Sequence, residues 1–355
     1  MMANKEFGVF LPIAKGGWII SKNTPPLDAS YQQNREAAIL ADQIGLDFIM
    51  SMSKWRGFGG ETEHWGSSLE SVTMMAGIAE VTHHARLIAT MHAGLHNPAV
   101  TAKMIATLDQ ISHGRAGLNI VSGSFKDEFE QMGEWDSHLD HDQRYAMTEE
   151  WTQLIKRLWC EKQVDHQGDY FNLTNCVSEP KPISVPRPYL VCAGQSERGL
   201  RFSVRHTDVC FIGGKDEEET RQISLMAKRI AAEYGTTAKT FCMSTIICAE
   251  TDEEAETLAQ FYRDGLDIEA VKSMMHSFGV DVGEKSNAMV ERSQNAFMTH
   301  TAIGNPETCR KQLSDLLREC ELDGVMLIFP DYVKGLTTFG EKILPQLRAE
   351  FAYTQ

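Results

Sequence analysis

The sequence of 355 residues lacks the signatures of several large classes of protein. No apolar run approaches the roughly 18 residues of a membrane-spanning helix, so no transmembrane helix is predicted. The N-terminal stretch places Lys5 and Glu6 before the apolar run FGVFLPI and has no small-residue cleavage site. This run therefore predicts a first strand rather than a signal peptide.

Positive charge is also scarce, because 34 Lys and Arg stand against 49 Asp and Glu, a formal net charge of −15. This balance argues against general binding to nucleic acid or to an anionic membrane surface, although one local site can still hold a small phosphorylated ligand. The eight cysteines form no C-x-x-C motif, and several lie in apolar, strand-like runs. They are expected to be reduced thiols in a cytoplasmic protein.

No linker, repeat or low-complexity segment divides the chain, so a single domain over 1–355 is predicted. Eight short apolar runs are expected to be strands: 7–11, 48–52, 87–91, 117–121, 189–193, 209–212, 241–249 and 325–329. Eight amphipathic stretches are expected to be helices: 31–45, 69–82, 98–111, 141–159, 196–206, 216–234, 252–265 and 305–320. Nearly continuous apolar strands that alternate with helices predict a (β/α)8 TIM barrel, with a doubly wound open sheet as the alternative.

Two segments do not fit this alternation and are expected to be insertions after strands four and seven. Residues 160–187 place Gln167-Gly168-Asp169 between short alternating pieces, which predicts a β-hairpin. Residues 266–300 are polar and irregular, and they are interpreted as an inserted helical or mobile segment. Because barrels place lids beyond the carboxyl ends of strands, this second insertion is a candidate lid.

Polar residues near the carboxyl ends of strands three and four are candidates for chemistry. Thr90 is followed by His92 and His96, two histidines four residues apart that could ligate a metal. No acidic partner is obvious, so no metal site is predicted. Asn119 lies inside an apolar strand, and its amide is either a satisfied core group or is directed at a ligand.

After strand two, Ser53 and Lys54 lead into WRGFGG at 55–60. The glycines allow a flat ligand to approach the backbone and the aromatic rings can stack on it, but a plain glycine-rich surface turn has the same composition. Neither the phosphate loop G-x-x-x-x-G-K-[ST] nor the dinucleotide fingerprint G-x-G-x-x-G occurs.

The best candidate for a phosphate site is CAGQS at 192–196, which leads from strand five directly into a helix. Free backbone N–H groups, a glycine and Ser196 at a helix start favour an anion. The acidic stretch 138–142 fits a second helix start better than a metal cluster. Arg144 and Tyr145 could reach a phosphate from its first turn.

Taken together, segments over most of the chain resemble the bacterial luciferase-like, FMN-dependent monooxygenases, and among them the branch that opens a pyrimidine ring. The resembling segments are GVFLPI at 8–13, GGWIIS at 16–21, WRGFGG at 55–60, ATLDQISHGRAGLNIVSG at 106–123, EFEQMGEW at 128–135, CAGQS at 192–196 and GVMLIFPDYVKGLTTFGEKILP at 324–345. The resemblance implies FMN contacts at seven residues: Ser53, Lys54, Asn119, Glu128, Arg144, Tyr145 and Ser196. It also implies that Thr90 and Asn119 hold O2 beside the reduced flavin.

The resemblance further implies an oxygenase that uses reduced FMN and O2 to cleave a carbon–heteroatom bond in a small molecule, with a pyrimidine-type ring amide as the expected substrate. Because no dinucleotide fingerprint is present, NADH or NADPH would be used by a separate flavin reductase. A homo-oligomer is also implied.

The chain departs from the pyrimidine branch where the substrate should bind. Ser122-Gly123-Ser124 stands where that branch has Thr-Gly-Trp, residues 92–97 are more polar, and 266–300 matches poorly. One alternative is therefore a sulfone or alkanesulfonate monooxygenase, with Arg56 or His92 as the cation that binds a sulfonate. Others are a deazaflavin-dependent dehydrogenase, which would not need Thr90 or Asn119, and a barrel that only stores or senses flavin.

Overall fold

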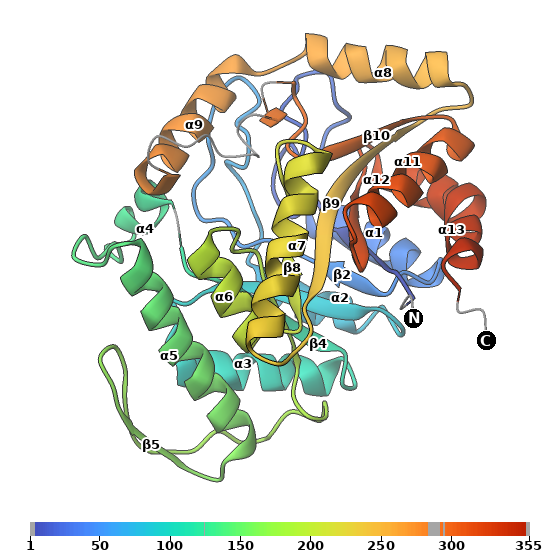
Figure 1. Ribbon diagram of the computed structural model, residues 1–355. Coiled ribbons are helices and arrows are strands. Elements are labelled where there is room, and N and C mark those ends of the chain that lie inside the picture. The colour runs from blue at the N-terminus through green and yellow to red at the C-terminus, as the bar shows by residue number, and fades with distance from the viewer. Residues whose placement is uncertain (1–3, 124, 283–291, 294, 353–355) are drawn as a thin grey trace.

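The computed structural model describes residues 4–123, 125–282, 292–293 and 295–352 (Figure 1). Its centre is a barrel of eight parallel strands, each close to one of the predicted apolar runs. They are β1 (Glu6–Phe10), β2 (Phe48–Met50), β3 (Arg86–His92), β4 (Ala116–Val121), β7 (Tyr189–Cys192), β8 (Val209–Phe211), β9 (Lys239–Cys248) and β11 (Gly324–Ile328). Ser124 and residues 283–291 and 294, which belong to segments singled out in the sequence, lie outside the described residues.

The sheet closes on itself. β1 pairs with β11 on one side and with β2 on the other, and pairing continues through β3, β4, β7 and β8. β8 then pairs with β9, with Val209 opposite Lys239, and β9 pairs with β11. These pairings confirm the predicted (β/α)8 barrel and exclude an open sheet, which would leave two free edges.

All eight predicted helices are present outside the barrel, with boundaries within two or three residues. They are α1 (Tyr31–Gln43), α2 (Ser71–Ala79), α3 (Pro98–Ile111), α5 (His141–Cys160), α6 (Glu197–His206), α7 (Glu217–Glu233), α8 (Asp252–Asp264) and α11 (Pro306–Glu319). Asp140 caps α5 in a capping box with Gln143, which confirms the acidic stretch as a helix start. Within the described part of the chain, no helix combines the length and apolarity needed to cross a bilayer.

The two insertions lie at opposite ends of the molecule in Figure 1. Between α5 and β7, strands β5 (Val164–Gln167) and β6 (Asn172–Cys176) pair antiparallel. After α8, helix α9 (Ile268–Val282) contacts the short helix α4 (Lys126–Glu130).

The interpretation of 266–300 as an inserted helical or mobile segment leaves out the strand that follows it. β10 (His300–Gly304) begins at the end of that range and pairs in parallel with β9, on the flank of β9 opposite β11. It escaped prediction because HTAIG is short and only partly buried, so it forms no apolar run. The C-terminal helices α12 (Tyr332–Thr338) and α13 (Leu344–Glu350), joined by the π-helical turn η1 (Phe339–Ile343), were also not predicted.

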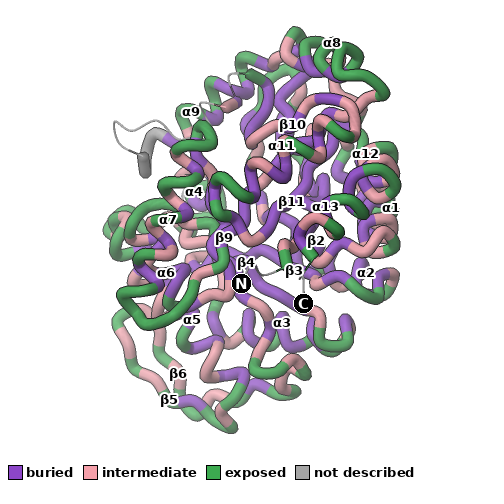
Figure 2. Tube along the Cα trace, turned by 45° about the vertical axis from the view of Figure 1, so that its right-hand side comes forward, coloured by how far each residue is buried: buried purple, intermediate pink, exposed green. Residues whose placement is uncertain are grey.

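Figure 2 shows the strands as the buried centre of the molecule, and all eight cysteines are free thiols. The segment GGWIIS connects the second insertion to this centre. Ile20 donates its N–H to Ala296 O at 2.9 Å and accepts from Asp267 N at 3.2 Å. Trp18 packs on Phe10, with ring centroids 4.4 Å apart. This segment therefore sets the position of the chain on both sides of α9.

Asp109, in the segment 106–123 that carries part of the family resemblance, has a structural role. Its carboxylate is fully buried on α3 and accepts hydrogen bonds from Ile183 N, Ser184 N, Ser184 Oγ and Ala116 N, at 2.6–3.3 Å. It thus holds the chain after β6 against β4.

Replacing Asp109 by alanine should lower the free energy of unfolding by roughly 2–4 kcal/mol, because the donors around it lose their acceptor. Urea unfolding followed by circular dichroism measures the change. Gln110→Ala, at the neighbouring exposed position of α3, is the control and should change stability by less than about 0.5 kcal/mol. Equal losses in the two variants would contradict this role for Asp109.

Candidate functional site

The carboxyl ends of β2, β3 and β4 bring together a chain of polar side chains. Thr90 Oγ1 donates to Ser51 O at 2.5 Å, and Asn119 Nδ2 donates to Thr90 Oγ1 at 3.1 Å. Thr90 and Asn119 stand opposite each other in the pairing of β3 with β4, and each is at least 95% buried. The two residues assigned to the oxygen side are therefore in contact.

The direction of these hydrogen bonds is fixed by the backbone. A carbonyl oxygen only accepts, so the Thr90 hydroxyl hydrogen points to Ser51 O and the Thr90 oxygen must accept from the Asn119 amide. Asn119 Oδ1 is left buried without a partner. A buried acceptor without a partner lowers the free energy of unfolding by about 1–3 kcal/mol. Such a group is typical of a position where a bound ligand supplies the missing hydrogen bond.

His92 extends this group by one repeat along β3. Its Nε2 lies 3.3 Å from Ser53 O, and its Nδ1 is buried without a partner. Burial lowers the pKa of His92 to about 4, so the ring is neutral near pH 7. It therefore does not supply the cation that a sulfonate would need. His96 contacts the carbonyl of His92 through Nδ1 at 3.0 Å, and no group of three metal-ligating side chains is found among the described residues. We call Ser51, Ser53, Thr90, His92 and Asn119 the strand-end cluster.

Lys54 and Glu128 form a buried ion pair beside the strand-end cluster. Lys54 Nζ lies 3.2 Å from Glu128 Oε2, and both side chains are at most 3% exposed. The other carboxylate oxygen accepts from Trp55 N. The ammonium group also lies over the rings of Phe125 (3.8 Å to the centroid) and Phe58 (4.7 Å). Burial lowers the pKa of Lys54, and the Glu128 carboxylate opposes this shift.

A cavity of about 470 Å³ opens beside this ion pair. Lys54, Glu128 and Phe58 line its inner side, and Arg56 lies at its wall. Helix α9 contributes four polar side chains to the wall: Lys272, Ser273, His276 and Ser277. Part of the second insertion thus faces the site.

A second group of predicted residues gathers where α5 and α6 begin. Ser196 caps α6 by accepting from Gly199 N at 3.1 Å, and its Oγ lies 3.3 Å from His141 Nε2. Tyr145 hydrogen-bonds both Ser196 and Ser122, while burial raises the pKa of its phenol well above the usual range. We call His141, Arg144, Tyr145 and Ser196 the helix-start cluster.

The glycine of CAGQS is required for this arrangement. A Cβ at Gly194 would lie 2.3 Å from Tyr145 Oη, so a side chain there would displace the phenol. Arg144 donates to Leu139 O at 2.9 Å and lies over the ring of Trp135 at 5.1 Å. The structure therefore brings Tyr145 and Ser196 into contact, while Arg144 contacts the loop before α5.

Ser122, which directly follows β4, connects the two clusters through its bond to Tyr145. All eight predicted site residues thus lie at the carboxyl end of the barrel or at the adjoining helix starts. Their roles toward a cofactor remain predictions.

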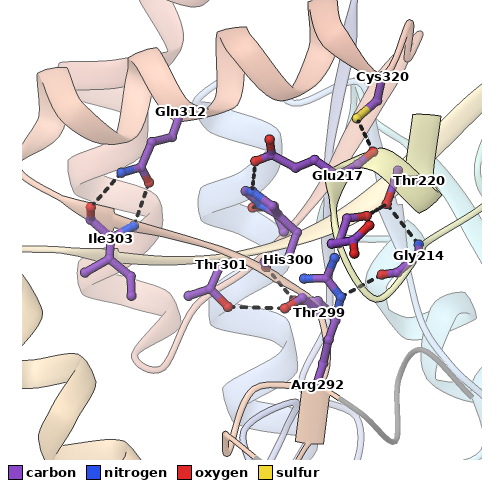
Figure 3. A network of polar contacts seen from close by, with 12 residues as sticks. Gly214, Glu217, Thr220, Arg292, Thr299, His300, Thr301, Ile303, Gln312 and Cys320 are labelled. Atoms are coloured by element: carbon purple, nitrogen blue, oxygen red, sulfur yellow. Dashed lines mark hydrogen bonds and ion pairs between the residues drawn. The ribbon is translucent and has the colours of Figure 1, made fainter. Parts of the chain in front are cut away.

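A further polar network lies beside β10 (Figure 3). Arg292 Nε donates to Gly214 O at 2.7 Å, and His300 contacts Ser244 Oγ at 2.9 Å and Glu217 at 3.4 Å. A cavity of about 430 Å³ adjoins Arg292 and is also lined by Lys215. This network ties the end of the second insertion to the loop after β8.

The sequence analysis allowed a helix within 266–300 but named neither the α9 side chains that line the cavity nor Phe125. Val271, Met274 and Phe278 are apolar and recur at helical spacing, so the helix could have been placed more exactly. Phe125 gives no such signal, since its contact with Lys54 joins positions that are far apart in the chain.

Replacing Glu128 by glutamine should lower the free energy of unfolding at pH 7 by roughly 2–4 kcal/mol, because Lys54 loses its carboxylate partner. At pH values below the lowered pKa of Lys54 in the folded state, Lys54 is protonated in both the folded and the unfolded state. Between that pKa and the ordinary value of 10.5, which applies to the unfolded state, only the unfolded state carries the proton. The free energy of unfolding therefore rises with pH in this window.

The Glu128 carboxylate raises the pKa of Lys54, so this pKa falls further in the Glu128→Gln variant and the variant gains more stability with rising pH than the unmodified protein does. The stability deficit of the variant should therefore shrink between pH 7 and pH 10, as measured by urea unfolding. Glu130→Gln, at an exposed position of the same short helix, is the control. A deficit that is constant across this range would contradict the account of the ion pair.

The comparisons with known proteins agree with this geometry. The family model described as luciferase-like monooxygenase matches residues 2–323. The pyrimidine monooxygenase RutA of Acinetobacter baylyi is 35% identical over 348 residues, which covers 96% of this chain and 94% of that protein. The protein of the same name from Pseudomonas savastanoi is 36% identical over 346 residues and covers 96% of each chain.

Solved structures share the fold. Riboflavin lyase RcaE, solved with modified FMN and its substrate riboflavin, has a TM-score of 0.85 at 21% identity and covers 98% of this chain and 92% of its own. The long-chain alkane monooxygenase LadA has a TM-score of 0.83 at 19% identity, with 99% and 93% covered. The barrel, the family model and the curated relatives together establish that the chain belongs to the luciferase-like monooxygenases, a family of flavin-dependent enzymes.

Proposed function

We propose that the protein is the oxygenase component of a two-component system, which uses reduced FMN and O2 to cleave a carbon–heteroatom bond in a pyrimidine-type ring amide. The observation that carries this proposal is the contact between Thr90 and Asn119, because it leaves a buried, unpartnered amide oxygen at the carboxyl end of the barrel. The names of the curated relatives support the choice of substrate class.

The residues present fit a flavin mononucleotide. The helix-start cluster offers Ser196, Tyr145 and Arg144 to the phosphate, at two helix starts that favour an anion. Ser53, Lys54, Asn119 and Glu128 would hold the ring system from the other side. Lys54 and Glu128 line the cavity of about 470 Å³ there, together with the rings of Phe58 and Phe125. The unpartnered Asn119 Oδ1 supports a ligand at this end of the barrel, since an N–H of the flavin or of a substrate beside it would complete this acceptor.

When bound, reduced FMN supplies the electrons for oxygen activation, and the chain supplies placement and a dry pocket. Asn119 Nδ2 has a second N–H beyond the one donated to Thr90, and this hydrogen can stabilise negative charge that develops on oxygen. The Thr90 hydroxyl is committed to Ser51 O, so Thr90 is a positioning residue that orients the amide. NADH or NADPH would be consumed by a separate reductase, and a cytoplasmic homo-oligomer stays a prediction.

Sulfones and sulfonates are the alternative substrates. Arg56 lies at the wall of the cavity, where it could bind a sulfonate. The neutral ring of His92 removes the other cation on which that alternative depends.

Aerobic turnover with FMN, NADH, a flavin reductase and uracil should give a ring-opened product with one added oxygen, detected by mass spectrometry. In the Asn119→Ala variant, product formation should fall roughly 100-fold while reduced FMN still binds. Asn172→Ala, in the exposed strand β6, is the control. Unchanged product formation by Asn119→Ala would remove Asn119 from the oxygen site.

Replacing Ser196 by alanine should weaken the binding of FMN by up to about tenfold and leave the binding of riboflavin unchanged, because only FMN carries the phosphate. Fluorescence titration under anaerobic conditions measures both ligands. Ser30→Ala removes the equivalent cap of α1, away from the site, and controls for the loss of a helix cap. An equal loss for both flavins would place the phosphate elsewhere.

A further inference from the structure

The strand-end cluster contains two buried hydrogen-bond acceptors that have no partner, Asn119 Oδ1 and His92 Nδ1. Both residues are at least 96% buried. They lie on the adjacent strands β4 and β3, and Thr90, which contacts Asn119, is two residues before His92 on the same strand. Because side chains of a strand alternate between faces, Thr90 and His92 point to the same side.

Hydrogen bonds to main-chain carbonyls show that Asn119 Oδ1 and His92 Nδ1 are acceptors. Ser51 O takes the Thr90 hydrogen, which turns the Asn119 NH2 group toward Thr90 and its oxygen away. Ser53 O can only accept, so His92 carries its hydrogen on Nε2. The ring is neutral near pH 7, and Nδ1 therefore presents a lone pair.

We propose that Asn119 Oδ1 and His92 Nδ1 accept hydrogen bonds from N–H groups of the substrate. The substrate is thus an N–H-bearing compound such as a cyclic amide or ureide, and not a sulfone or a sulfonate. This inference rests on the proposed oxygenase function and deepens it by assigning two groups that select the substrate class.

The chemistry of the alternatives supports the choice. Sulfones and sulfonates present only acceptor oxygens, which would face the lone pairs of both atoms and leave them unpaired. Between them, Asn119 and His92 offer two acceptors without a partner and one uncommitted N–H, the second N–H of the Asn119 amide, so their balance favours donors on the ligand. The ring of Phe129 packs against the ring of His92 in a T-shaped contact, with centroids 5.2 Å apart.

A methylation series tests the proposal, with equilibrium dialysis of the anaerobic protein carrying reduced FMN. The probes are uracil, 1-methyluracil, 3-methyluracil, 1,3-dimethyluracil and dimethyl sulfone. Each lost hydrogen bond should weaken binding by up to about tenfold, so the dimethyl compound should bind far more weakly than uracil. Dimethyl sulfone should not bind.

Variants of His92 test whether His92 Nδ1 contributes to the binding of uracil. His92→Phe removes the acceptor and keeps a ring against Phe129, and it should weaken uracil about tenfold but leave one of the two monomethyl isomers unaffected. His92→Asn, which restores an acceptor, should recover part of the loss. His64→Phe is the matched control, because His64 is also fully buried with both nitrogens unpartnered but lies outside the strand-end cluster.

The binding of dimethyl sulfone without the binding of the uracils would overturn the proposal, and so would a failure of every N–H-bearing probe to bind. Binding of uracil by His92→Phe as tightly as by the unmodified protein would overturn it too. If that variant also binds reduced FMN more weakly, the N–H that His92 accepts belongs to the flavin. Equilibrium dialysis of reduced FMN against the anaerobic protein, without any substrate, tests the proposed flavin function separately.

Discussion

Closure of the sheet through the pairing of β8 with β9 is the constraint on which the rest of the structure depends. A closed parallel barrel gathers the carboxyl ends of all eight strands around one axis, so residues from distant parts of the sequence meet there without any contact of their own. Thr90 and Asn119 are 29 positions apart, and the register of β3 with β4 alone places them opposite each other. The same end receives α9, which the segment around Ile20 holds in position.

The carboxyl end of the barrel holds two kinds of polar group, one neutral and one charged. The strand-end cluster is neutral and is oriented by backbone carbonyls, which leaves acceptors without partners. Lys54 and Glu128 carry full charges but satisfy each other inside a wall of aromatic rings. The unpaired polarity therefore lies in the neutral cluster, and a ligand of this site meets directed hydrogen bonds rather than an uncompensated charge.

The sequence predicted the parts of the fold that leave a local pattern. Each barrel strand is a short apolar run and each of the eight outer helices is amphipathic, so both were found. β10 was missed because its residues are only partly buried, and the C-terminal helices because no expected strand follows them. At the site, resemblance placed Thr90 and Asn119 together, and the structure agrees. The pairing of Lys54 with Glu128 and the tautomer of His92 could not be predicted, since both depend on atoms that only the folded barrel brings close.

The use of main-chain carbonyls to orient Thr90 and His92 has a consequence for how this enzyme can evolve. The hydrogen bonds that orient Thr90 and His92 end on the main-chain oxygens of Ser51 and Ser53, so a substitution at Ser53 can leave the polarity of the site unchanged. The Ser51 hydroxyl is more constrained, because it also bonds Ser71 Oγ, which accepts from Thr90 N. A descendant with a preference for hydrogen-bond-accepting substrates would have to change residues 90, 92 or 119 themselves. Substitutions at those three positions are therefore the ones expected to change which substrates the enzyme accepts.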